Sequence, residues 1–126
     1  MDQTKQHTKL RYSFLFALEG VASGIKGERN MMLHFAMMAL VTVAGFLFSI
    51  SETEWLACVI LFGLVVGMEM MNTAIETVVD ICMPHQDPRA KRAKDVAAGA
   101  VLLVSIAAAV AGCIIFLPKI LLSTLG

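Results

Sequence analysis

Three long apolar segments, separated by short polar stretches, dominate this chain of 126 residues. Each is about as long as the roughly 20 apolar residues that cross the hydrocarbon core of a bilayer. The pattern therefore predicts three membrane-spanning helices. Pro118 is expected to end the third, because proline breaks the hydrogen-bond ladder of a helix. The predicted spans are residues 31–50, 55–79 and 96–117.

A fourth helix is predicted ahead of the first span. Residues 1–9 are polar, whereas residues 10–29 place apolar side chains such as Leu10, Phe14 and Leu18 at helical spacing among charged ones. Beside a membrane, an amphipathic helix of this kind lies in the interface. The alternative, a core helix of a soluble bundle, is disfavoured by the three apolar segments that follow. The whole chain is expected to be one all-α membrane domain.

Composition and charge agree with a membrane protein. Hydrophobic residues make up 58% of the chain and charged residues 16%, against about 25% charged residues in soluble domains. The formal net charge is zero, so the chain as a whole offers nucleic acid no attraction. Three scattered cysteines fit neither a disulfide framework nor a metal motif.

The distribution of basic residues predicts the topology. Five precede the first span and four lie between the second and third, whereas the stretch SETE between the first and second has none. Lys119 alone follows the third span. By the positive-inside rule, the N-terminus and residues 80–95 are cytoplasmic and the C-terminus is outside the cell membrane.

A line of polar side chains interrupts the second span. Glu69, Asn72, Glu76 and Asp80 are spaced by 3, 4 and 4 residues, which confines them to an arc of about 80° on a helix. A carboxylate near the bilayer centre costs about 2.5–3.5 kcal/mol on the insertion scale. Glu69, about two turns deeper than Glu76, must therefore face a partner, a cavity or water. One interpretation is a polar contact between helices; the other is a site open to the cytoplasm.

Further polar groups are expected at the same membrane face. Glu28, before the first span, and Glu76 could share a divalent cation, since Mg²⁺ often takes one or two carboxylates plus phosphate oxygens. Lys94, next to Asp95 at the start of the third span, could hold a phosphate. These groups suit metal-bound phosphate and a hydroxyl that needs a base. The sequence contains no P-loop and no glycine-rich loop of the kinase type.

The stretches EMMNTAIETVVD and AKRAKDVAAGAVL resemble the signature of the prokaryotic diacylglycerol kinase and undecaprenol kinase family, and the likeness covers nearly all of residues 10–118. The resemblance implies a surface helix, three transmembrane helices and a homotrimer whose active sites are shared between subunits. It also implies transfer of the γ-phosphate of Mg-ATP to a lipid hydroxyl.

The resemblance assigns roles to individual residues. Glu69 would be the catalytic base and, with Ala98, would contact the lipid substrate; Glu28 and Glu76 would hold the metal. The residues expected to bind the nucleotide are Lys9, Glu28, Asn72, Glu76, Asp80, His85, Gln86, Asp87, Lys94 and Asp95.

The sequence leaves two candidates for the acceptor lipid. The stretches KGERNMMLH, ISETEW and FLPKI resemble the Gram-positive branch of the family, which favours undecaprenol over diacylglycerol.

Two other functions compete with a lipid kinase. A small proton- or cation-coupled transporter would use Glu69 as its membrane carboxyl, and a non-catalytic assembly subunit would use small-residue helix contacts.

Overall fold

A computed structural model describes residues 3–26 and 29–126, and everything it describes outside short connections is helical. The helices are α1 (Gln3–Ile25), α2 (Arg29–Leu47), α3 (Glu52–Cys82) and α4 (Pro88–Leu125). The predicted all-α class is confirmed, and α2, α3 and α4 are each long and apolar enough to cross a membrane. The chain is therefore a multi-pass membrane protein, while the homotrimer stays a prediction.

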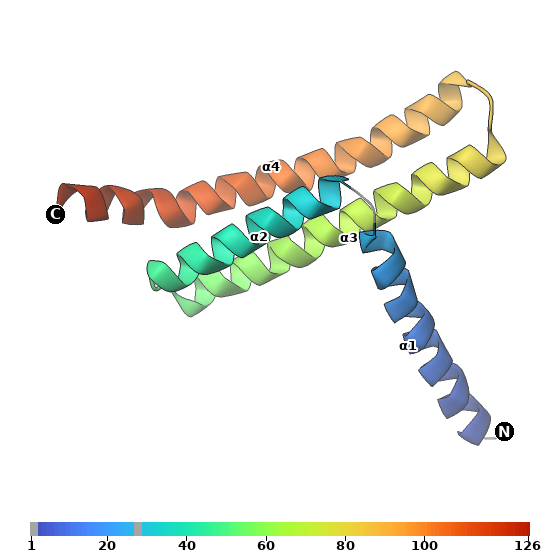
Figure 1. Cartoon of the computed structure of the whole chain (residues 1–126), viewed down its shortest axis with the longest axis horizontal. Coiled ribbons are helices and arrows are strands. Elements are labelled where there is room, and N and C mark those ends of the chain that lie inside the picture. Colours follow the sequence, from blue (N-terminus) through green and yellow to red (C-terminus); the bar gives the residue numbers. More distant parts are fainter. Residues whose placement is uncertain (1–2, 27–28) are drawn as a thin grey trace.

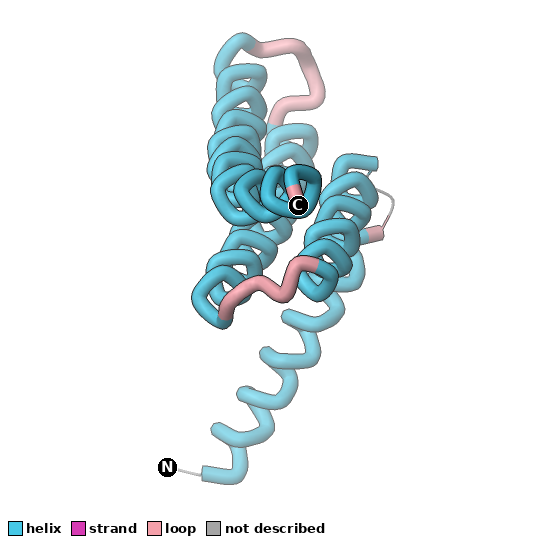
Figure 2. Tube along the Cα trace, turned by 90° about the vertical axis from the view of Figure 1, so that its left-hand side faces the viewer, coloured by secondary structure: helices cyan, strands magenta, loops and turns pink. Residues whose placement is uncertain are grey.

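The three spanning helices run side by side and the chain reverses direction between them, whereas α1 leaves the bundle at a steep angle (Figure 1). Figure 2, turned by 90°, shows the same separation of α1 from the other helices. At 1.5 Å per residue, α3 is about 46 Å long and α4 about 57 Å, well beyond a hydrocarbon core of about 30 Å. The α3–α4 hairpin consequently extends past the start of α2 (Figure 1).

All four helices in the described part of the chain begin before their predicted positions. Helix α1 begins at Gln3, seven residues before the predicted position, within the polar stretch. Helix α3 begins at Glu52, because Ser51 and Glu54 form a capping box: the Glu54 N–H donates to Ser51 Oγ at 3.2 Å, and the Ser51 N–H donates to Glu54 Oε2 at 2.8 Å. The stretch SETE is thus largely the first turn of a helix.

The prediction that Pro118 ends the third span is wrong, since Pro118 lies inside α4 and the helix continues to Leu125. Proline costs a helix one backbone hydrogen bond, but its fixed φ is itself close to the helical value. The next residue, Lys119, donates from Nζ to Glu54 Oε1 at 2.8 Å and so ties the following turn to α3. The start of α4 also differs: the helix begins at Pro88, so Lys94 lies within it rather than opening it.

The α2–α3 turn is closed by backbone hydrogen bonds of the Schellman type. The Ile50 N–H donates to the Gly45 carbonyl at 3.1 Å, and the Ser49 N–H donates to the Phe46 carbonyl at 3.3 Å. Ser49 adopts a positive φ of 48°, the left-handed conformation that this motif requires. Helix α2 therefore ends at Leu47 and the chain turns directly into α3.

The main hydrophobic cluster lies at this same end of the bundle. Its buried members are Ile50, Cys58 and Ile115, from the turn, α3 and α4. Partly buried side chains packed against it are Val41, Phe48, Trp55, Phe62 and Phe116. The Trp55 ring lies so close to α2 that a Cβ at Gly45 would be 2.6 Å from Trp55 Cη2. Gly45 thus permits the close approach of α2 and α3.

Most other apolar side chains of α2, α3 and α4 are exposed, including Leu33, Leu64 and Leu103. For helices of this length and apolarity, the surrounding lipid or neighbouring protein takes the place of a core.

Substitution of Gly45 tests the packing at the turn. We expect Gly45→Ala to lower the free energy of unfolding by about 1–3 kcal/mol, because the added methyl group overpacks against the Trp55 ring. The measurement is unfolding of the protein in detergent. In a Trp55→Leu background, which lacks the ring, the same substitution should cost much less; an equal cost in both backgrounds would contradict this packing.

Candidate functional site

The predicted polar stripe lies on one uninterrupted stretch of α3. At its deep end, Glu69 is 3% exposed and is the one buried charged residue in the described part of the chain. The Glu69 carbonyl accepts a hydrogen bond from Thr73 Oγ1 at 3.1 Å, one turn along the helix. At the other end, the Asp80 side chain is 64% exposed. The stripe therefore runs from a buried carboxyl group to open solvent.

Asn72 and Glu76 form the middle of the stripe. Asn72 Nδ2 donates to Glu76 Oε1 at 3.3 Å, which holds the two side chains together one turn apart. Asn72 Oδ1 is buried and accepts no hydrogen bond. A buried polar atom without a partner is costly, so this oxygen is suited to receive a ligand.

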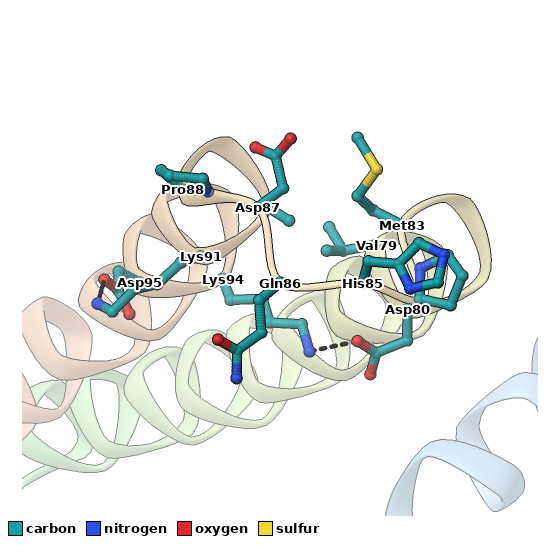
Figure 3. A pocket seen from close by; sticks show the side chains of 12 residues that line it. Val79, Asp80, Met83, His85, Gln86, Asp87, Pro88, Lys91, Lys94 and Asp95 are labelled. Atoms are coloured by element: carbon teal, nitrogen blue, oxygen red, sulfur yellow. Dashed lines mark hydrogen bonds and ion pairs between the residues drawn. The ribbon is translucent and has the colours of Figure 1, made fainter.

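The tip of the α3–α4 hairpin forms an open cavity of about 750 Å³ (Figure 3). It lies between the last turn of α3, the linker and the first two turns of α4, as Figure 3 shows. Its lining residues are Val79, Asp80, Met83, Pro84, His85, Gln86, Asp87, Pro88, Ala90, Lys91, Lys94 and Asp95.

Two ion pairs organise the charged side chains of this cavity (Figure 3). Lys94 of α4 reaches across to Asp80 of α3, and Lys91 pairs with Asp95 along α4 itself. The Lys94–Asp80 pair joins the two arms of the hairpin. Both pairs are largely accessible to water, so each adds little stability and can exchange partners when a charged ligand arrives.

Asp87 starts α4. It accepts from the Arg89 N–H at 2.7 Å and forms an ion pair with the Arg89 guanidinium at 3.0 Å. The Arg89 side-chain and backbone hydrogen bonds hold the pKa of Asp87 below its ordinary value of 3.8. Asp87 is thus a helix cap as well as a cavity residue.

The structure gathers six of the predicted nucleotide-binding residues around one cavity. They are Asp80, His85, Gln86, Asp87, Lys94 and Asp95. Asn72 and Glu76 lie on the same stripe of α3 as Asp80. They are two turns and one turn closer to Glu69 than Asp80 is. Ala98, predicted to contact the lipid, is exposed on α4 one turn after Lys94.

One predicted residue is not brought to this region within one chain, and a second lies outside the described residues. Lys9 is exposed in the N-terminal half of α1, and α1 leaves the bundle at a steep angle (Figure 1). Glu28, predicted to share a metal with Glu76, lies outside the described residues.

The cavity contains one charged residue that was not among those predicted to bind the nucleotide. Lys91 was expected only to add positive potential near a phosphate held by Lys94, yet it lines the cavity and pairs with Asp95. Its spacing of four residues from Asp95 was the available signal, because such residues are neighbours on a helix. The apolar lining residues Val79, Met83 and Ala90 carry no comparable signal in the sequence.

The donor set fits a magnesium ion that accompanies a phosphate. Among the described residues, no three carboxylate, histidine or cysteine side chains converge to hold a metal by themselves. Magnesium does not need such a cage, since it often takes one or two carboxylates and completes its shell with phosphate oxygens and water. Glu76 offers one carboxylate, and the unpaired Asn72 Oδ1 lies on the same stripe.

Comparison with known proteins covers nearly the whole chain. The family model of prokaryotic diacylglycerol kinase matches residues 15–116. The chain is 37% identical over 119 residues to the undecaprenol kinase of Bacillus subtilis, an alignment that spans 94% of this chain and 97% of that protein. It is 39% identical over 117 residues to a diacylglycerol kinase of Synechocystis, which spans 89% of this chain and 65% of that protein.

The Asp87 cap should make the start of α4 sensitive to acid. The pKa of Asp87 is lower in the folded protein than its ordinary value of 3.8. At pH values between the folded and the ordinary pKa, the unfolded chain therefore binds more protons than the folded protein. The stabilisation is therefore present above pH 3.8 and is lost as the pH falls through the lower, folded pKa.

We expect Asp87→Ala to increase amide hydrogen exchange in the first turn of α4 at pH 7, and to have a progressively smaller effect as the pH is lowered below 3.8, once exchange is corrected for its intrinsic pH dependence. Glu52→Ala, a change at an exposed acidic residue of α3 at the opposite end of the bundle, is the control and should leave this turn unchanged. An Asp87→Ala effect that stays equal from pH 7 to pH values below 3.8 would contradict the role of the charged cap.

Proposed function

The chain belongs to the prokaryotic diacylglycerol kinase family and is a lipid kinase, and from this premise we propose that it transfers the γ-phosphate of Mg-ATP to the hydroxyl group of undecaprenol. Similarity to the Bacillus subtilis undecaprenol kinase over nearly the full length of both chains supports undecaprenol as acceptor. Similarity to the Synechocystis diacylglycerol kinase keeps diacylglycerol as the second candidate.

The observation that carries this proposal is the gradient of exposure along the stripe of α3. Glu69 is buried, whereas Asp80, three turns further on, faces water beside the hairpin cavity. A lipid hydroxyl has to be reached from the membrane and ATP from water. A row of polar groups that passes from a buried to an exposed position serves both substrates of such a transfer.

At the buried end, Glu69 acts as the general base. Its carboxylate removes the proton from the lipid hydroxyl while that oxygen attacks the γ-phosphorus, and the bond from the γ-phosphorus to the bridging oxygen of ATP breaks, so that ADP leaves. Burial of Glu69 to 3% exposure keeps competing water away from the attacked phosphorus. Ala98, which is small and exposed on α4, leaves room beside the stripe for the acceptor.

At the exposed end, the hairpin residues hold the nucleotide. Lys94 exchanges Asp80 for a phosphate oxygen, and Lys91 adds positive charge at the cavity. His85 and Gln86 of the linker offer hydrogen-bonding groups along its wall. The transfer relies mainly on positioning and on neutralising charge, as phosphoryl transfer generally does.

Glu76 and Glu28 are the proposed metal carboxylates, with Asn72 orienting Glu76 through the 3.3 Å hydrogen bond. When bound, Mg²⁺ supplies positive charge that offsets the charge on the phosphate oxygens. Asn72 Oδ1, buried and without a partner, accepts a hydrogen bond from the bound nucleotide or its water shell.

The proposal includes a homotrimer, with N-terminus and site on the cytoplasmic side and the C-terminus outside. Exposed apolar side chains along α2, α3 and α4 support contacts between copies. Lys9, remote from the hairpin cavity of its own chain, would contact the nucleotide bound by a neighbouring subunit. The basic residues at the start of α4 favour the cytoplasmic placement of the hairpin.

Glu69→Gln tests the proposed base. We expect kcat for lipid phosphorylation to fall by about 10²–10⁴-fold, the usual contribution of a general base, while ATP binding is retained. The assay follows transfer of labelled phosphate from Mg-ATP to undecaprenol in detergent micelles. Glu52→Gln, the same change at an exposed position on α3, is the matched control. Full activity of Glu69→Gln would refute the role of Glu69.

Acceptor competition tests the choice of lipid. Undecaprenol and diacylglycerol are presented together at equal surface concentration, and the products are separated. We expect undecaprenyl phosphate to predominate; a predominance of phosphatidic acid would transfer the proposal to diacylglycerol.

Glu76→Gln tests the metal site. Loss of one carboxylate ligand should raise the Mg²⁺ concentration for half-maximal activity by about 10–100-fold, and excess Mg²⁺ should recover part of the activity. The measurement is a magnesium titration at fixed ATP, with Glu52→Gln as control. An unchanged magnesium requirement would show that Glu76 does not bind the metal.

A further inference from the structure

We propose that Gly24 is a positioning residue, because its missing side chain lets the last turn of α1 pack against Met70 beside Glu69, and that this contact governs access of the lipid acceptor. The inference rests on the proposed function in one respect, namely that the acceptor meets Glu69. It concerns Gly24 and Met70, which belong neither to the polar stripe nor to the hairpin cavity.

The contact between α1 and α3 is confined to the end of α1. From Lys9 to Ser23 every residue of α1 is exposed, and burial begins at Gly24 and Ile25. A Cβ at Gly24 would lie 3.3 Å from both Cγ and Cε of Met70, closer than ordinary van der Waals contact. A Cβ at Gly20, one turn earlier, would meet nothing within 4 Å. Gly24 therefore sits at the point where the two helices touch.

This contact holds a long helix near one end. Helix α1 has 23 residues and is about 34 Å long. A larger side chain at Gly24 would push α1 and α3 apart at Met70, and the shift would be felt directly at the next residue, Glu69. The side chain of Met70 is flexible, so it fills the space that the glycine leaves without fixing it rigidly.

The contact is separated from the nucleotide side of the site. Asp80, which lines the hairpin cavity, follows Glu69 by 11 residues on α3, or about 16 Å. Helix α1 runs away from the tip of the α3–α4 hairpin (Figure 1) and carries exposed apolar side chains such as Phe14 and Leu18. Its last turn contacts α3 at Met70, the residue after Glu69, so a displacement there should affect the acceptor at Glu69 more than ATP at the hairpin.

The test is steady-state kinetics of Gly24→Leu with both substrates varied. We expect KM for undecaprenol to rise by about tenfold, as small displacements at a reacting centre do, with KM for ATP within about twofold of wild type. Gly20→Leu makes the same change on the same helix where space is open. It gains equally in helix propensity and should match the wild type.

Combination with Met70→Ala gives the decisive measurement. Removing the methionine side chain makes room for the leucine, so the double variant Gly24→Leu/Met70→Ala should recover a KM for undecaprenol within about threefold of wild type, the non-additivity expected of residues in contact. A variant that merely unfolds would not be rescued in this way. If Gly24→Leu fails to fold, Gly24→Ala, with its single methyl group, is measured in both backgrounds instead.

The proposal is overturned if the Gly24 variant equals Gly20→Leu, if both KM values rise together, or if Met70→Ala gives no recovery. These outcomes are distinct from failure of the proposed base. Full activity of Glu69→Gln would remove the catalytic role of Glu69 and leave the steric coupling between Gly24 and Met70 to be measured independently.

Discussion

In a bilayer, the backbone N–H and C=O groups of a spanning segment have no water to bond with and must bond within the protein. That requirement makes α2, α3 and α4 long continuous helices, and their apolar side chains need no common core. It also restricts polar side chains to positions where other groups of the protein can bond with them. Glu69, buried to 3% exposure, is the one charged group that the described part of the chain places beyond easy reach of water.

The two ends of the bundle are held together by different forces. At the α2–α3 turn, aromatic packing around Trp55 and Phe116 combines with the part-buried Lys119–Glu54 ion pair. At the hairpin tip, the Lys94–Asp80 pair joins α3 to α4, and its Asp80 side chain is 64% exposed. Exposed pairs are weak and salt-screened. The packed end therefore fixes the helices, and the site lies at the end that is free to rearrange around a charged ligand.

Helix length connects these features to catalysis. If α3 matched the hydrocarbon core, the polar stripe would either lie wholly in lipid or be absent. Because α3 is about 16 Å longer than that core, one helix holds both the buried Glu69 and the exposed Asp80. In the proposed function, this single rigid element joins the lipid acceptor to the nucleotide.

The sequence alone determined the all-α class, the three apolar spans, a helix ahead of the first span and the stripe from Glu69 to Asp80. These follow from hydropathy and helical spacing, which are local properties of the chain. The family motif in turn indicated a lipid kinase. The extent of α4 was misjudged at Pro118, because a proline's local cost is outweighed when the next turn is held by a contact between residues 54 and 119.

Only the tertiary structure decided how the helices meet. The following features all join residues on different helices: the ion pair of Lys94 with Asp80, the open cavity between α3, the linker and α4, the fit of Trp55 over Gly45 and the contact of Met70 with Gly24. Hydropathy fixes which segments enter the membrane, but it is nearly uniform around such helices and does not specify which faces touch. That choice depends on the shapes of side chains at a few close approaches, and these exist only once the helices are packed.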